Sequence, residues 1–216
     1  MLSLTVIICI LTVLLSFSAF NNHKLINDLI FWPAELTRRN QWYRFITYGF
    51  IHGDFMHLIF NMIALYSFGE SIENAFKEPI LFGKNGGLVF LGFYFSALII
   101  SVIPDYIHHR DHYHYRALGA SGAVSAIIFS AILFNPMGGI GFAFLPGINI
   151  PGIIFAVLYL VVSTILAKKG QDNIGHMAHI TGSVYGLLFT YLATKLFTEY
   201  DVIDVFLRRI QSGFEF

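Results

Sequence analysis

Three short polar sets interrupt the apolar sequence, and their residue types suit acyl-transfer chemistry. The segment 119–122, Gly-Ala-Ser-Gly, places the hydroxyl of Ser121 among small residues at the start of an apolar run. His57 and Asn61 lie four residues apart in a second run, and His179 opens a third. A serine becomes a strong nucleophile when a base such as histidine takes its proton. The sets therefore predict a nucleophile, a base and a pair of hydrogen-bond donors.

Ser121 is expected within the first turn of its helix. Backbone N–H groups there have no partner within the helix, and the helix dipole favours negative charge. The N–H of Ser121 is thus a candidate donor to an oxyanion. Gly119 and Gly122 leave room for a second helix or a substrate strand to approach. Taken alone the motif is weak, because serine in a membrane helix usually bonds its own backbone.

His57 and Asn61 share one face of their helix, because residues four apart are neighbours on a helix surface. The histidine ring and the asparagine amide can both donate hydrogen bonds. A developing oxyanion needs such preorganised donors. The alternative is a pair that only links helices, with each bond contributing less than about 2 kcal/mol.

His179 is followed by Gly182 and Gly186, a spacing of small residues that marks a face packed closely on another helix. If that helix carries Ser121, the imidazole can reach the hydroxyl and act as a general base. The alternative for a lone histidine is a packed core side chain.

The composition is that of a polytopic membrane protein in one domain, residues 1–216. Hydrophobic residues make up 56% of the 216 positions and charged residues only 12%, about half the charged fraction of a soluble domain. The formal net charge is zero, which gives no case for nucleic-acid binding. Cys9 is the single cysteine, so an intrachain disulfide is excluded. We expect neither a metal nor a cofactor.

A bilayer core needs roughly 20 apolar residues per helix. On this basis we expect six membrane-spanning helices, at residues 2–20, 55–75, 88–103, 117–134, 151–167 and 175–197.

The connections between these segments differ in character. Segment 21–49 is too polar to cross a membrane but carries Trp42 and Tyr43, aromatic side chains suited to the membrane interface. Segment 105–116 is expected to be a short polar loop and segment 135–150 an uncharged turn. The tail, 198–216, is expected to form a short surface helix.

Six spans place both termini on one side, but the basic residues oppose a cytoplasmic position for them. Five lysines and arginines fall on the side of the termini: Lys77, Lys84, Lys195, Arg208 and Arg209. Eight fall on the other side: Lys24, Arg38, Arg39, Arg44, Arg110, Arg116, Lys168 and Lys169.

At this point the chain resembles the rhomboid intramembrane serine proteases over nearly its whole length. Besides Ser121, His179, His57 and Asn61, the matching positions are Trp42, Tyr43, Arg44, His52, Gly119, Gly122, Gly182 and Gly186. The resemblance implies an all-α, six-transmembrane-helix rhomboid bundle with a long, membrane-embedded first loop. Tyr43 stands where the family more often has tryptophan.

The resemblance also implies the activity. Ser121 and His179 would form a catalytic dyad that cleaves transmembrane-segment substrates near the outer membrane boundary. The Ser121 N–H with His57 and Asn61 would hold the oxyanion. The lipid bilayer and transmembrane proteins are the implied partners, and the oligomeric state stays open. We expect a bacterial cytoplasmic membrane with both termini cytoplasmic, and we follow the family's orientation over the charge count.

One departure from the family is Ser125. It stands four positions after the nucleophile, where the family often has an aromatic residue packed on the catalytic imidazole. We hypothesise that Ser125 leaves the His179 ring less constrained or bonds to it.

Two other functions stay open. The first is a non-catalytic rhomboid-like protein that escorts membrane segments, although such relatives lack the nucleophile or the base. The second is a histidine-based metal transporter, because imidazoles at close spacing can bind Zn²⁺ or Ni²⁺. Its candidate ligands are His108, His109, His112 and His114. Glu70 and Glu73, which share a helix face, lie at the far end of their span.

Overall fold

The computed structural model describes residues 2–142, 145–169 and 175–214, and these are mostly helical. Six helices follow the six predicted apolar segments: α1 (Leu4–Phe20), α5 (Phe55–Lys77), α6 (Gly86–Ser101), α8 (Ser121–Phe134), α9 (Gly152–Lys169) and α10 (His176–Phe197). Three stretches in the described residues are long and apolar enough to cross a membrane: Phe55–Lys77, Gly83–His109 and Gly152–Lys169. The helices α1 and α8 are apolar but shorter.

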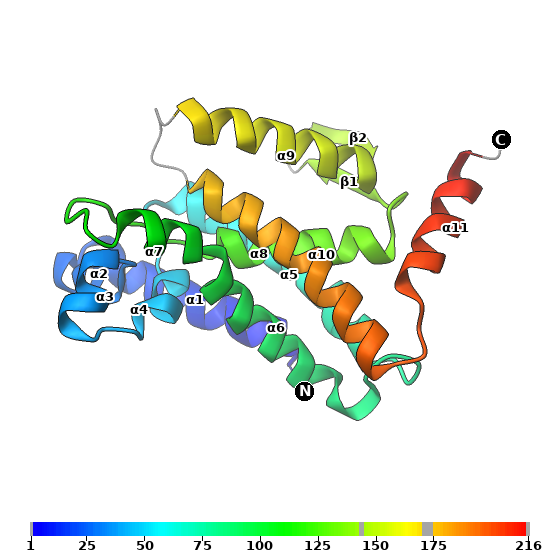
Figure 1. Cartoon of the computed structure of the whole chain (residues 1–216), viewed down its shortest axis with the longest axis horizontal. Helices are drawn as coiled ribbons and strands as arrows, with labels where there is room; N and C mark the ends of the chain where they lie inside the picture. The colour runs from blue at the N-terminus through cyan, green and yellow to red at the C-terminus, as the bar shows by residue number, and fades with distance from the viewer. Residues whose placement is uncertain (1, 143–144, 170–174, 215–216) are drawn as a thin grey trace.

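Helix α8 forms the centre of the bundle. It contacts α5, α6, α9 and α10, and eleven of its 14 residues are buried. In Figure 1, α9 lies along one side of the bundle, next to the hairpin, while α1 lies on the opposite side. Because α8 is enclosed by its neighbours, a side chain at its first turn is held by several helices at once.

The segment between α1 and α5 folds into short helices at one end of the bundle (Figure 1). These are α2 (His23–Leu29), α3 (Pro33–Arg39), α4 (Arg44–Thr47) and the 3-10 turn η1 (Tyr48–Phe50). The buried Arg44 guanidinium holds the segment together: Nη1 donates to the carbonyls of Asn27 and Ile30, at 2.8 and 2.7 Å, and Nε donates to Gln41 Oε1 at 2.7 Å.

Three expected boundaries are corrected. Helix α8 starts at Ser121 rather than at residue 117, because Ala117 pairs with Phe31 in an isolated antiparallel bridge. The expected loop after residue 104 begins with a helix, α7 (Ile103–His109), since Pro104 is tolerated in a first helical turn. The expected turn after α8 forms an antiparallel hairpin, β1 (Gly139–Phe142) with β2 (Leu145–Pro151).

The glutamates at the end of α5 cap the start of α1. The carboxylate of Glu73, which is fully buried, accepts hydrogen bonds from the N–H groups of Leu4 and Thr5 at 3.0 and 2.8 Å and from the Thr5 hydroxyl at 2.8 Å. The Ser3 hydroxyl donates to Glu70. The first N–H groups of a helix lack partners in the helix and favour a negative charge. These carboxylates therefore have a structural role.

The tail contains helix α11 (Val202–Phe214), with residues 215–216 outside the described residues. It projects from the end of the bundle opposite α2 to α4 (Figure 1). Arg209 Nη1 donates to the carbonyl of Phe134, the last residue of α8, at 2.6 Å. The 3-10 turn η2 (Gly83–Asn85) leads into α6.

Candidate active site

The hydroxyl of Ser121 and the imidazole of His179 are in hydrogen-bond contact. Ser121 Oγ lies 2.8 Å from His179 Nε2, and both side chains are half-buried. Ser121 is the first residue of α8, and His179 lies in the first turn of α10. For the hydroxyl to donate its proton, Nε2 must be the unprotonated ring nitrogen. The geometry suits removal of the Ser121 proton by His179.

Glycines make this contact possible by letting α8 and α10 pack backbone to backbone. A Cβ added at Gly182 would lie 2.0 Å from the carbonyl oxygen of Gly122, and one at Gly186 would lie 2.1 Å from that of Ala126. A Cβ at Gly122 would also lie 2.4 Å from Ser101 Oγ. Larger residues would force the helices apart and carry the imidazole away from the hydroxyl.

Gly119 brings His57 next to the segment that leads into Ser121. Its φ of 108° is a conformation that residues with a side chain rarely adopt. A Cβ there would lie 2.6 Å from Cε1 and 2.8 Å from Nε2 of His57. The half-buried His57 ring therefore lies directly against the backbone two residues before Ser121.

Asn61 is buried one helical turn after His57. Its Nδ2 donates to the His57 carbonyl of the same helix at 2.9 Å. An asparagine amide has two N–H groups, so this bond uses one of its two donors. Among the described residues, no hydrogen bond joins Asn61 to Ser121.

His52 connects three parts of the chain around the site. The N–H of Ala120 donates to its Nε2 at 3.4 Å, and its Nδ1 lies 3.0 Å from Ser16 Oγ. Ser16 in turn donates to the carbonyl of Phe50 at 3.1 Å. These bonds assign the proton to Nδ1 of a neutral ring. Burial, with a smaller contribution from nearby His57, lowers the pKa of His52 to about 3.

Trp42 and Tyr43 lie away from the dyad, on the surface of the segment between α1 and α5. Their side chains are 51% and 46% exposed. Trp42 stacks on Phe45 with ring centroids 6.2 Å apart, and the Arg44 guanidinium lies 5.5 Å from the Tyr43 ring centroid. Arg44 itself binds backbone carbonyls, so it organises the segment and does not contact the dyad.

Sequence reasoning missed Tyr159, which contacts both His179 and Ser125. Its ring stacks on that of His179, with centroids 6.0 Å apart and an interplanar angle of 29°. Its hydroxyl lies 2.6 Å from Ser125 Oγ, and Ser125 donates to the carbonyl of Ser121 at 2.8 Å. The Ser125 hydroxyl thus makes its described bonds to Tyr159 and Ser121 rather than to His179. The available signal was a phenol in an otherwise aliphatic stretch, 156–162.

The histidine-rich segment forms a cluster of rings outside the dyad. His109 stacks on Tyr115 with centroids 3.7 Å apart, and its Nδ1 lies 3.0 Å from Nδ1 of His112. Within residues 2–142, 145–169 and 175–214, no group of three or more His, Cys, Asp or Glu side chains is arranged to hold a metal ion. A pocket of about 950 Å³ lies beside this cluster and reaches His176, three residues before His179.

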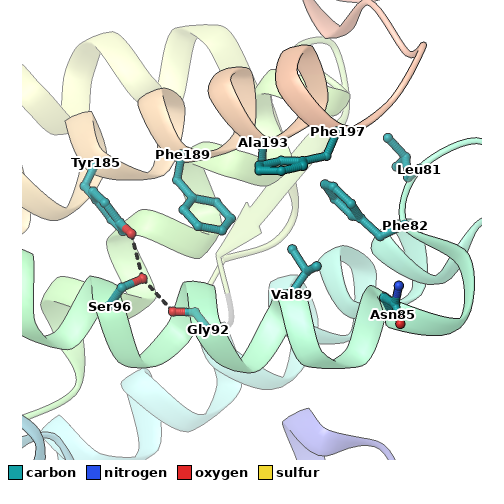
Figure 2. A pocket seen from close by; sticks show the side chains of 10 residues that line it. All are labelled: Leu81, Phe82, Asn85, Val89, Gly92, Ser96, Tyr185, Phe189, Ala193 and Phe197. Carbon is teal, nitrogen blue, oxygen red and sulfur yellow. Dashed lines mark hydrogen bonds between the residues drawn. The ribbon is translucent and has the colours of Figure 1, made fainter.

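A second pocket, of about 720 Å³, lies between α6 and α10 and is shown in Figure 2. At one end, Tyr185 donates to Ser96 Oγ at 2.6 Å, and Ser96 donates to the carbonyl of Gly92 at 2.5 Å. The other side chains that line the pocket are mostly apolar (Figure 2). Neither Ser121 nor His179 lines this pocket.

The fold and the site define a helical membrane protein that holds a serine and a histidine in hydrogen-bond contact between two closely packed helices. Residues 39–196 match the family described as the Rhomboid domain. The match covers well over half of the chain, so the chain belongs to the rhomboid family. The resemblance drawn from the sequence is confirmed.

Named relatives support the same family. The chain is 29% identical over 171 residues to RHOMBOID-like protein 12, mitochondrial, of Arabidopsis thaliana, covering 76% of this chain and 50% of the relative. It is 26% identical over 179 residues to YdcA of Bacillus subtilis (strain 168), named as a candidate rhomboid protease, covering 78% and 79%. It is 27% identical over 148 residues to the human presenilin-associated rhomboid-like protein, mitochondrial, covering 68% and 37%. The chain thus spans half or less of the plant and human relatives.

Proposed function

We propose that this chain is an intramembrane serine endopeptidase that uses a Ser121–His179 dyad. The observation that carries the proposal is the 2.8 Å contact between Ser121 Oγ and His179 Nε2 in a chain of the rhomboid family. A hydroxyl next to a basic imidazole is the arrangement expected of an activated nucleophile.

Ser121 Oγ attacks the carbonyl carbon of a peptide bond while His179 Nε2 takes the hydroxyl proton. The tetrahedral intermediate collapses when the carbon–nitrogen bond breaks, and His179 gives the proton to the leaving amine. The product is an ester between Ser121 and the substrate acyl group. Water then attacks the ester, with His179 taking a proton from water and returning it to Ser121 Oγ.

The oxyanion of each tetrahedral intermediate would be held by donors at the start of α8. The N–H of Ser121 lies in the first helical turn, where it has no acceptor within the helix. His57, packed against Gly119, and Asn61, with its second amide N–H, are the side-chain donors of the proposal. Removing one donor of this kind lowers kcat by about 100- to 1,000-fold.

We further propose one domain, residues 1–216, in which α1, α5, α6, α8, α9 and α10 cross the membrane as six spans. The segment between α1 and α5 lies in the interface, which fits the exposure of Trp42 and Tyr43. Substrates are transmembrane segments cut near the outer boundary. Both termini are cytoplasmic, in a bacterial cytoplasmic membrane. Antibody accessibility of tags at the two ends in sealed vesicles tests this orientation.

The deciding experiment for the chemistry is labelling of the purified chain with a fluorophosphonate probe in detergent and in lipid. Labelling should be lost in Ser121→Ala and His179→Ala. Ser18→Ala is the matched control, because Ser18 is exposed on α1 and bonds only its own helix in the described contacts. An intact chain that takes up no label in either medium would contradict the proposal and leave the escort function. Loss of activity with a chelator would favour a metal-dependent function instead.

A further inference from the structure

We infer that Tyr159 of α9 is a positioning residue whose ring keeps the imidazole of the general base, His179, directed at Ser121. The inference rests on the proposed function. It begins from a side chain on a third helix that contacts the imidazole of His179 directly and reaches the backbone of Ser121 through Ser125. The contacts are the ring stacking on His179 and the hydroxyl bond to Ser125.

The hydrogen bonds of Tyr159 and Ser125 have a defined donor and acceptor. Ser125 has a single hydroxyl hydrogen, and its Oγ lies 2.8 Å from the carbonyl of Ser121, which can only accept. That hydrogen is therefore committed to Ser121. The 2.6 Å contact with Tyr159 then requires the phenol to donate to Ser125 Oγ. Tyr159 is thus connected through Ser125 to the backbone of the nucleophile.

The ring contact acts on the base. An imidazole can rotate about its bond to Cβ, and proton transfer needs Nε2 to stay directed at Ser121 Oγ. The tyrosine ring covers one face of the imidazole at a centroid distance typical of interacting aromatic rings. The contact restricts the rotation of the His179 ring.

The tyrosine ring is itself held in place. Phe155, one turn earlier on α9, stacks on it with centroids 5.5 Å apart and an angle of 24°. Phe129 of α8 contacts it at 5.8 Å. Most other side chains of α9 face outward, and only Gly152 and Ser163 of this helix are buried. Tyr159 therefore connects an otherwise shallowly packed helix to the dyad.

The experiment measures the rate of fluorophosphonate labelling as a function of probe concentration for the full chain. Tyr159→Leu should lower the maximal rate by about 10-fold or more, with little change in the half-saturating concentration, because reactive geometry rather than probe binding is lost. Tyr159→Phe should stay within about 3-fold of the intact chain, because the ring is kept. Tyr191→Leu on α10 is the matched control, since that ring is 39% exposed.

A purely structural role is separated by thermal melting in detergent, which Tyr159→Leu should change no more than Tyr191→Leu does. If Tyr159→Leu fails to fold, the exchange variant Ser125→Tyr/Tyr159→Ser decides. It keeps one aromatic ring and both hydroxyl groups in the same space between α8 and α9, and it should label faster than Ser125→Ala/Tyr159→Leu.

The outcomes distinguish this inference from the proposed function. If Tyr159→Leu is labelled as fast as the unsubstituted chain while Ser121→Ala stays unlabelled, the inference is overturned and the proposed protease function still stands. A Tyr159→Phe variant as slow as Tyr159→Leu overturns it as well, because the hydroxyl rather than the ring would then be decisive. An exchange variant no faster than the double deletion also counts against it. If the intact chain takes up no probe, the proposed function fails first.

Discussion

Gly182 of α10 approaches Gly122 of α8 so closely that a single methyl group on it would lie 2.0 Å from the Gly122 carbonyl oxygen. Real side chains never reach such a distance, so backbone must move to admit one. The two helices that carry His179 and Ser121 therefore meet with no side chain between them at this point.

Replacement of Gly182 by alanine should push α8 and α10 apart and break the contact between Ser121 and His179. We expect a destabilisation of about 1–3 kcal/mol from overpacking and a fall in fluorophosphonate labelling to near background. Gly92→Ala is the matched control, because a Cβ at Gly92 meets nothing within 4 Å. It should label and melt like the intact chain. Normal labelling of Gly182→Ala would contradict this prediction, because it would mean that α8 and α10 can admit the methyl group without losing the contact between Ser121 and His179.

Gly119→Ala should disturb the site without opening the bundle. The new Cβ needs a strained φ and collides with His57, so we expect labelling to fall by about 10-fold or more as the proposed oxyanion donors shift. Gly83→Ala separates strain from collision, because Gly83 also has a positive φ, of 52°, but open space around it. That control should lose about 1–2 kcal/mol of stability from the left-handed backbone alone and keep its labelling rate. Equal labelling of both variants would remove the role given to the His57 contact.

The stability of the folded chain should fall in acid because of His52. Its pKa is about 3 in the folded chain and about 6.5 when unfolded. The unfolded chain therefore binds this proton first as the pH falls. The contribution of His52 is complete above pH 6.5 and is lost progressively below it, at no more than about 1.4 kcal/mol per pH unit.

Thermal melting in detergent at pH 7.5 and pH 5.5 tests this dependence. Between pH 7.5 and pH 5.5 the melting temperature of the intact chain should fall more than that of His52→Gln, which cannot titrate at that position. Parallel losses in both proteins would assign the acid sensitivity to other groups.

Glu73→Gln should destabilise the chain by about 1–3 kcal/mol, because a buried charged acceptor of several hydrogen bonds is replaced by a weaker one. Thermal melting is the measurement. Glu78→Gln is the control, since Glu78 is exposed just after the end of α5, and it should melt like the intact chain. Unlike Gly182→Ala and Gly119→Ala, Glu73→Gln should be labelled by the probe at the normal rate at temperatures where it stays folded. A labelling defect in the folded variant would connect this network to the dyad.

The apolar segments predicted from the sequence correspond to helices, because long runs of apolar residues leave the backbone few other ways to bond itself. The spacing of Gly182 and Gly186 likewise predicted the close face of α10. Boundaries were less predictable. Helix α8 starts late because Ala117 pairs with Phe31, a contact between residues 86 positions apart that no local pattern reveals.

Tyr159 was not predictable for the same reason. The sequence shows that Ser125 lacks a ring, but it does not show which other helix places a ring in that space. Helical spacing places Glu73 within reach of Lys77, four residues later, and the two form an ion pair. Its bonds to the N–H groups of α1, however, follow from the packing of α1 on α5, which no local pattern reveals. Both cases depend on which helices are neighbours.

The bond from Arg209 to the last carbonyl of α8 has a practical consequence for protein engineering. A truncation placed directly after α10 would preserve every residue of the proposed dyad and oxyanion site. It would nevertheless remove a cation from the negative end of the helix whose positive end carries Ser121. A minimal catalytic fragment of this chain should therefore include α11, and a purification tag is better separated from that helix by a spacer.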